Sequence, residues 1–142
     1  MHYGLEAIGR GQKIVNYTGH GSTDQWRGNL LTPSDVSGLQ NWDHLSLFVT
    51  MTCLNGYFQD PGIDSLAESL LKTERGGAVA VWSSSAMTGP AEQAIMNRVL
   101  YRNLFNGSMT IGEAVARAKA SVIDPDIRRT WILLGDPTMK LK

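Results

Sequence analysis

The stretch that decides the fold is Leu45-Ser46-Leu47-Phe48-Val49-Thr50-Met51-Thr52-Cys53-Leu54-Asn55-Gly56. Apolar and β-branched residues over 45–52 predict a β-strand, and the strand runs directly into the only cysteine of the chain. An Asn-Gly pair follows two residues later and predicts a turn. The strand therefore ends in a loop that carries a thiol.

A second unit of the same design lies upstream, at Lys13-Ile14-Val15-Asn16-Tyr17-Thr18-Gly19-His20-Gly21-Ser22. Its strand, over 13–17, ends in a loop where His20 stands between two glycines. The carboxyl ends of parallel strands form one edge of a sheet, and sites in open α/β sheets lie outside that edge. If the two strands are parallel neighbours, His20 and Cys53 meet there, so we interpret them as a Cys–His dyad.

Composition narrows the class of protein. The chain has 142 residues, which suits one domain over 1–142, and 42% hydrophobic with 18% charged residues is typical of a globular protein. Thirteen basic residues match thirteen acidic ones, so electrostatic capture of nucleic acid is not indicated. The longest apolar run, 78–82, is too short to span a bilayer, and no signal peptide is expected at the N-terminus. One cysteine excludes an internal disulfide and a multi-thiolate metal site.

The rest of the chain alternates helices with strands. Capping patterns and apolar periodicity predict helices near 32–38, 65–75, 91–105 and 110–122, and apolar runs predict strands at 78–82 and 130–134. This order predicts an α/β fold, a three-layer α/β/α sandwich with a mostly parallel sheet. The four strands are expected in the spatial order 13–17, 45–52, 77–82, 130–134. Residues 1–10 look like the tail of a helix, so we expect the chain to be part of a larger protein.

The motifs around the two loops resemble the gingipain family of cysteine peptidases, in the caspase-like clan. The likeness runs through Asn16-Tyr17-Thr18-Gly19-His20-Gly21-Ser22, Met51-Thr52-Cys53-Leu54-Asn55-Gly56-Tyr57-Phe58, Gly76-Gly77-Ala78-Val79-Ala80 and Leu134-Gly135-Asp136-Pro137-Thr138. His20 and Cys53 are 33 positions apart, whereas caspases show roughly 50 and carry a Gln-Ala-Cys signature that is absent here. The chain is thus nearer to gingipains than to caspases.

The resemblance implies a caspase-like sheet of six strands, the last antiparallel, with His after the third strand and Cys after the fourth. Here His20 already follows the first strand, so the resemblance implies that the first two strands are absent from this chain. The acidic partner of the histidine and the acid of the specificity pocket, expected upstream, have no counterpart. The resemblance further implies a bacterial, secreted cysteine endopeptidase, extracellular or at the cell surface, that needs no cofactor or metal and acts on peptides or proteins.

The chemistry expected of the dyad follows from the residue types. A free thiol has a pKa of about 8.5, and a neighbouring imidazole takes its proton or stabilises the thiolate. Cys53 would be the nucleophile, and His20 would deliver a proton to the leaving amine. By resemblance, the backbone N–H groups of Gly21 and Cys53 would bind the oxyanion. The resemblance also predicts that Trp82, Ser83 and Ser84 line the substrate cleft.

Each assignment has a structural alternative. Cys53 can be a buried small residue, and Trp82 can be a core residue at a strand end. His44 fits a solvated loop better than a zinc site with His20 and Cys53, and Trp26 and Asp24 either orient His20 or pack its loop. A catalytically inactive or sortase-like transpeptidase member of the same fold stays open as the alternative function. The strand at 13–17, left as a sheet edge, predicts association into a homo-oligomer.

Overall fold

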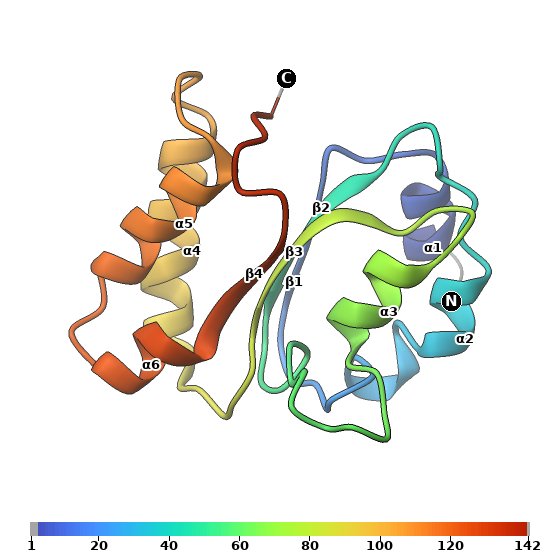
Figure 1. Cartoon of the computed structure of the whole chain (residues 1–142), viewed down its shortest axis with the longest axis horizontal. Coiled ribbons are helices and arrows are strands. Elements are labelled where there is room, and N and C mark those ends of the chain that lie inside the picture. The colour runs from blue at the N-terminus through green and yellow to red at the C-terminus, as the bar shows by residue number, and fades with distance from the viewer. Residues whose placement is uncertain (1–2, 142) are drawn as a thin grey trace.

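The computed structural model describes residues 3–141, and its centre is one four-stranded sheet. The strands are β1 (Ile14–Thr18), β2 (Ser46–Met51), β3 (Ala78–Ser84) and β4 (Trp131–Gly135). They lie in the order β1-β2-β3-β4; β1, β2 and β3 are parallel, and β4 is antiparallel to β3 (Figure 1). The predicted spatial order and the predicted direction of the last strand are both confirmed.

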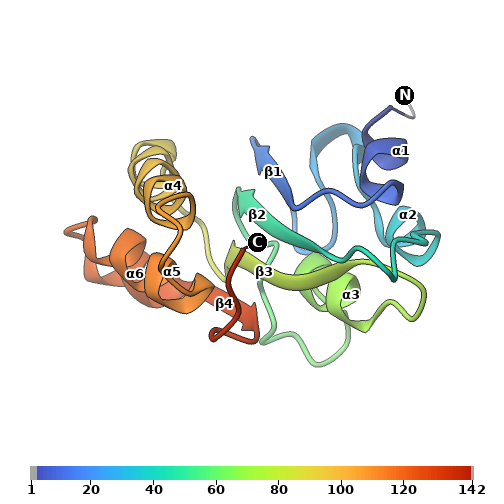
Figure 2. The ribbon, with the colours of Figure 1, turned by 90° about the horizontal axis from the view of Figure 1, so that it is seen from above.

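Helices cover both faces of the sheet and make three layers. The helices are α1 (Tyr3–Gly9), α2 (Pro33–Ser37), α3 (Leu66–Lys72), α4 (Pro90–Leu104), α5 (Ile111–Ala120) and α6 (Pro125–Thr130), with a short 3₁₀ turn, η1 (Arg27–Asn29). The first three helices lie on one side of the sheet and the last three on the other, as Figures 1 and 2 show. The α/β/α sandwich predicted from the alternation of elements is therefore confirmed.

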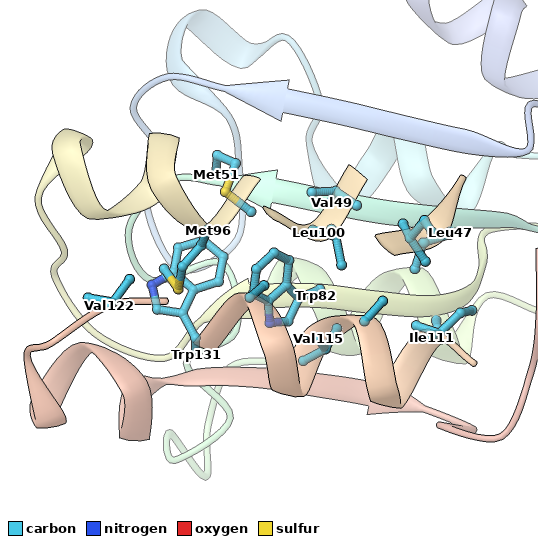
Figure 3. Close-up of a cluster of buried hydrophobic side chains, with 14 residues drawn as sticks. Leu47, Val49, Met51, Trp82, Met96, Leu100, Ile111, Val115, Val122 and Trp131 are labelled. Carbon is cyan, nitrogen blue, oxygen red and sulfur yellow. The ribbon is translucent and has the colours of Figure 1, made fainter. Parts of the chain in front are cut away.

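The core consists of two clusters because successive residues of a strand point to opposite faces. Phe48 and Val81 pack with the apolar residues of α2 and α3 on one face. Leu47, Val49 and Trp82 pack with α4 and α5 on the other, where Trp82 and Trp131 lie side by side with ring centroids 5.0 Å apart (Figure 3). All six residues of β2 are buried, and the strand lies between β1 and β3 in the sheet.

The helix boundaries follow from capping groups. Thr32, Ser65 and Thr110 each accept a hydrogen bond from the backbone N–H three residues later. The sequence predicts caps at Thr32 and Thr110 and at either Asp64 or Ser65, and the structure has Ser65 in that role. The predicted helix at 110–122 ends earlier, at Ala120. Helix α6 was not predicted, although Asp124 caps it and Pro125 occupies its first turn. Its six residues are too few for apolar periodicity to reveal.

Strand β1 lies at the edge of the sheet. Its residues are only partly buried, and within residues 3–141 no other strand pairs with its outer side. The exposed edge predicted from the sequence is therefore present in the structure.

Within residues 3–141, no helix has the length and apolar character needed to cross a membrane.

Candidate active site

The register of β1 on β2 brings the His20 and Cys53 loops to one edge of the sheet. Thr18 and Met51 are the last paired residues of the two strands, and His20 and Cys53 each lie two residues beyond that pair. The Gly19 N–H extends the ladder by donating to the Met51 carbonyl at 3.2 Å. Neighbouring strands are about 4.8 Å apart, so the two loops begin side by side. No hydrogen bond joins the two side chains within the described residues.

The His20 loop is held by aromatic packing. Tyr17 and Trp26 stack with centroids 4.2 Å apart and an interplanar angle of 9°, and the Tyr17 hydroxyl donates to the His20 carbonyl at 2.8 Å. The His20 side chain is exposed and lines a hollow of about 300 Å³ together with Trp26 and Arg27. Trp26 is buried and packs the loop, and Asp24 accepts from Ser22 rather than from His20.

Asn55 joins the two loops. Its side-chain amide is fully buried and donates to the Ser22 carbonyl at 2.6 Å and to the Gln25 carbonyl at 3.4 Å. Its backbone carbonyl accepts from Ala67 in the first turn of α3. Because these bonds connect residues 30 or more positions apart, Asn55 fixes the His20 loop to the loop that carries Cys53. The sequence indicated only a turn at this position.

Cys53 is half-buried, and its sulfur lies against the peptide groups of Thr88. The Thr88 N–H donates to Sγ at 3.5 Å, and Sγ lies 3.6 Å from the Thr88 carbonyl oxygen. The next residue, Leu54, has a φ of 63°, in the left-handed region that costs an ordinary side chain free energy. Its N–H donates to the Ala86 carbonyl at 3.2 Å, which holds the turn against the loop after β3.

Two backbone N–H groups near this edge make no hydrogen bond within the described residues. Within residues 3–141, neither the Gly21 N–H nor the Cys53 N–H donates to a protein acceptor. The Gly21 backbone also packs closely, since a Cβ there would lie 2.8 Å from Thr52 Oγ1 and 3.1 Å from Asn55 Nδ2. These are the two donors that the family resemblance implies for an oxyanion.

The predicted cleft residues Trp82, Ser83 and Ser84 lie elsewhere than expected. All three side chains are fully buried, and Trp82 belongs to the core with Trp131. The backbone of β3 pairs with β2 on one side and β4 on the other, so it has no free edge for an extended peptide. The prediction that these residues line the cleft is corrected on this ground. The segment after β3, Ala86 to Thr88, is the part that reaches Cys53.

The remaining candidates lie outside this edge. His44 is exposed, lies with Nδ1 3.2 Å from the Asp43 carboxylate and precedes β2, so the length of the strand separates it from Cys53. Asp136 accepts from Thr138, which lowers its pKa, and it follows β4 at the opposite end of the sheet. Among the described residues, no group of three or more histidine, cysteine or carboxylate side chains is placed to hold a metal ion.

Comparison with known proteins gives a consistent match. A family model described as peptidase family C25 matches residues 5–142. Gingipain R2 of Porphyromonas gingivalis is 28% identical over 97% of this chain, and the match spans 21% of that protein. Gingipain R1 of the same species is also 28% identical over 97% of this chain and 15% of its own length. The chain thus spans about a fifth or less of these relatives.

Solved structures agree with the sequence matches. The crystal structure of the Arg specific cysteine proteinase gingipain R superposes with a TM-score of 0.81 at 25% identity, over 97% of this chain and 35% of that chain. The complex of the pro- and mature domains of Porphyromonas gingivalis RgpB gives a TM-score of 0.86 at 24% identity, over 97% and 36%. The gingipain resemblance and the caspase-like architecture inferred from the motifs are both confirmed.

Proposed function

Since this chain belongs to peptidase family C25, we propose that it carries the Cys–His centre of a cysteine endopeptidase. The observation that supports this most directly is the register of β1 on β2. It leaves His20 and Cys53 equally far beyond the Thr18–Met51 pair at one edge of the sheet. Residues 1–142 then form a single, partial caspase-like peptidase domain.

Formation of the acyl-enzyme needs a nucleophile, an acid and an oxyanion site. The Cys53 thiolate attacks the carbonyl carbon of the scissile peptide bond, and the carbonyl electrons move onto oxygen. The N–H groups of Gly21 and Cys53 donate to that oxyanion. When the electrons return, the C–N bond breaks, protonated His20 gives its proton to the leaving amine, and a thioester remains on Cys53.

Hydrolysis of the thioester uses the same groups in reverse roles. Neutral His20 accepts a proton from a water molecule, and the hydroxide attacks the thioester carbonyl. The two backbone donors bind the second oxyanion, the C–S bond breaks, and the Cys53 thiolate is regenerated as the carboxylic acid leaves. No cofactor is needed to balance either step.

The substrate and location follow from the family resemblance as part of this proposal. The substrate is a peptide or protein chain, and the protein acts outside the cell or at the cell surface. The gingipain R of the solved structure is an Arg specific cysteine proteinase.

The test is the rate of iodoacetamide labelling of Cys53 as a function of pH, which needs no peptide substrate. A free thiol labels with a midpoint at about pH 8.5. We expect the wild-type protein to label well below that value, since an imidazolium stabilises a thiolate. His20→Ala moves the profile toward about pH 8.5. His44→Ala, which removes an exposed histidine at the other end of β2, leaves the profile unchanged. Identical profiles for the wild type and His20→Ala would refute the dyad.

A further inference from the structure

A second feature of the site is the peptide backbone that faces the Cys53 sulfur. Thr88 presents both its N–H, at 3.5 Å, and its carbonyl oxygen, at 3.6 Å, to Sγ. An N–H donor stabilises the thiolate, whereas a carbonyl oxygen accepts a hydrogen bond only from the protonated thiol. The orientation of Thr88 therefore influences which form of the sulfur is favoured.

Gln93 holds Thr88 in that orientation. Its side-chain N–H donates to Thr88 Oγ1 at 2.7 Å and to the Thr88 carbonyl oxygen at 3.4 Å. Gln93 is 5% exposed and lies in the first turns of α4, where its backbone N–H donates to the Gly89 carbonyl. A buried amide with both contacts on one residue anchors the segment between β3 and α4 to the helix.

The contact with the carbonyl oxygen also affects the sulfur directly. The Gln93 amide and the Cys53 S–H share one acceptor, so the amide weakens the interaction that favours the protonated thiol. Removal of the amide leaves that oxygen to the thiol alone and releases Thr88 from the helix. Both effects work against the thiolate.

We propose that Gln93 is a positioning residue that sets the reactivity of the Cys53 thiol through the Thr88 peptide, given the nucleophilic role proposed for Cys53. Gln93 does not contact the sulfur; it acts through the two hydrogen bonds to Thr88.

The titratable groups on the neighbouring elements have to stay unchanged in the test. His20 and Asp24 belong to the loop after β1, and Glu92 lies in the first turn of α4 with its carboxylate against Gly89. Gln93→Leu changes none of these charges. It replaces the amide with an apolar side chain of similar size, so a shift in the labelling profile reports the loss of the hydrogen bonds.

The experiment measures iodoacetamide labelling against pH for the wild type, Gln93→Leu and Thr88→Val. We expect Gln93→Leu to raise the midpoint by about 0.5 to 1 pH unit, the size that one hydrogen bond supports. Thr88→Val removes only the Oγ1 contact and gives a smaller rise. Asn103→Leu is the matched control, because its amide donates to a carbonyl of the same helix, away from the sulfur.

Several outcomes separate this inference from the proposed function. Superimposable profiles for the wild type, Gln93→Leu and Thr88→Val, with native circular dichroism, would overturn the role of Gln93. If Gln93→Leu does not fold, the comparison of Thr88→Val with the wild type decides. An unchanged profile in His20→Ala alone would refute the dyad, whereas the Gln93 comparison would still stand by itself.

Discussion

At the scale of single residues, the site depends on atoms that approach each other closely. Gly21 lies where the His20 loop crosses the loop after β2, and a side chain at this position has no space. Asn55 fills the region beside it and supplies the hydrogen bonds between the loops. The position of His20 relative to Cys53 is therefore set by neighbours that carry no charge.

Gly21→Ala tests this close approach. The added Cβ would lie 2.8 Å from Thr52 Oγ1 and 3.1 Å from Asn55 Nδ2, so the loops have to separate. Strain of this kind costs about 1–3 kcal/mol. We expect a lower free energy of unfolding in urea and slower labelling of Cys53. In Gly4→Ala, the control, the Cβ meets nothing within 4 Å and the helix gains a better former, so stability is unchanged or rises by up to about 1 kcal/mol.

Whether the sequence could predict a site residue depends on how far along the chain its contacts reach. His20 and Cys53 were predicted because each ends a strand, a local pattern. The roles of Asn55 and Gln93 were not predicted, because the side chain of Asn55 contacts Ser22 and Gln25 far along the chain and Gln93 reaches Cys53 only through Thr88. Trp82 was misplaced because a tryptophan at a strand end looks the same whether it faces a cleft or the core.

At the scale of elements, the helices that frame the site depend on their first turns. Ser65 and Glu68 form a reciprocal capping box at the start of α3, with the Ser65 hydroxyl fully buried. Strand and helix positions were predictable within a few residues because apolar alternation and capping are local signals. The sequence does not predict the short helix α6, because its six residues are too few to show an apolar period.

Ser65→Ala removes the cap of α3. The Glu68 N–H loses its side-chain acceptor, so we expect a loss of about 1 kcal/mol in the free energy of unfolding, measured by urea denaturation. Ser34→Ala is the control, since Ser34 is exposed in α2 and its hydroxyl makes no hydrogen bond within the described residues. An equal loss in both variants would contradict a specific role for the cap.

The capping box of α5 predicts a dependence of stability on pH. The Thr110 backbone N–H donates to Glu113, which holds the pKa of that carboxyl below its ordinary value of 4.5. A carboxyl with a lower pKa in the folded state stabilises the protein above the unfolded value, and the contribution is lost as the pH falls through the folded value. As the pH is lowered below about 4.5, we expect the urea concentration at the unfolding midpoint to decrease. The decrease is smaller in Glu113→Gln.

If Glu113→Gln and the wild type lose the same stability over this acidic window, the carboxylate does not contribute through its bond to Thr110. Asp136→Asn offers a second comparison, because the Thr138 hydroxyl and N–H lower the pKa of Asp136 in the same direction.

At the scale of the whole molecule, the sheet has one parallel edge strand. Strand β1 pairs only with β2 among the described residues, and its side chains are partly exposed. Unpaired backbone groups on such a strand are a template for another chain. We therefore propose that this chain associates with itself through β1.

The association should depend on concentration and on the edge residues. We expect the mass measured by light scattering to rise with protein concentration. Asn16→Lys places a charge on an exposed residue of β1 and lowers the association, because lysine on an edge strand discourages pairing. Arg102→Lys, an exposed change on α4 that keeps the charge, serves as the control. A constant monomer mass for the wild-type protein at high concentration would refute the association.

The pairing of Thr18 with Met51 has a consequence for how correct folding can be measured. A slip of β1 by one residue along β2 would move His20 by about 3.3 Å and turn every side chain of the strand to the other face. The content of strand and helix would stay the same, so circular dichroism would not detect the error. The fraction of molecules that label rapidly at Cys53 would fall, and the amplitude of a single chemical reaction would then count the molecules that are correctly aligned.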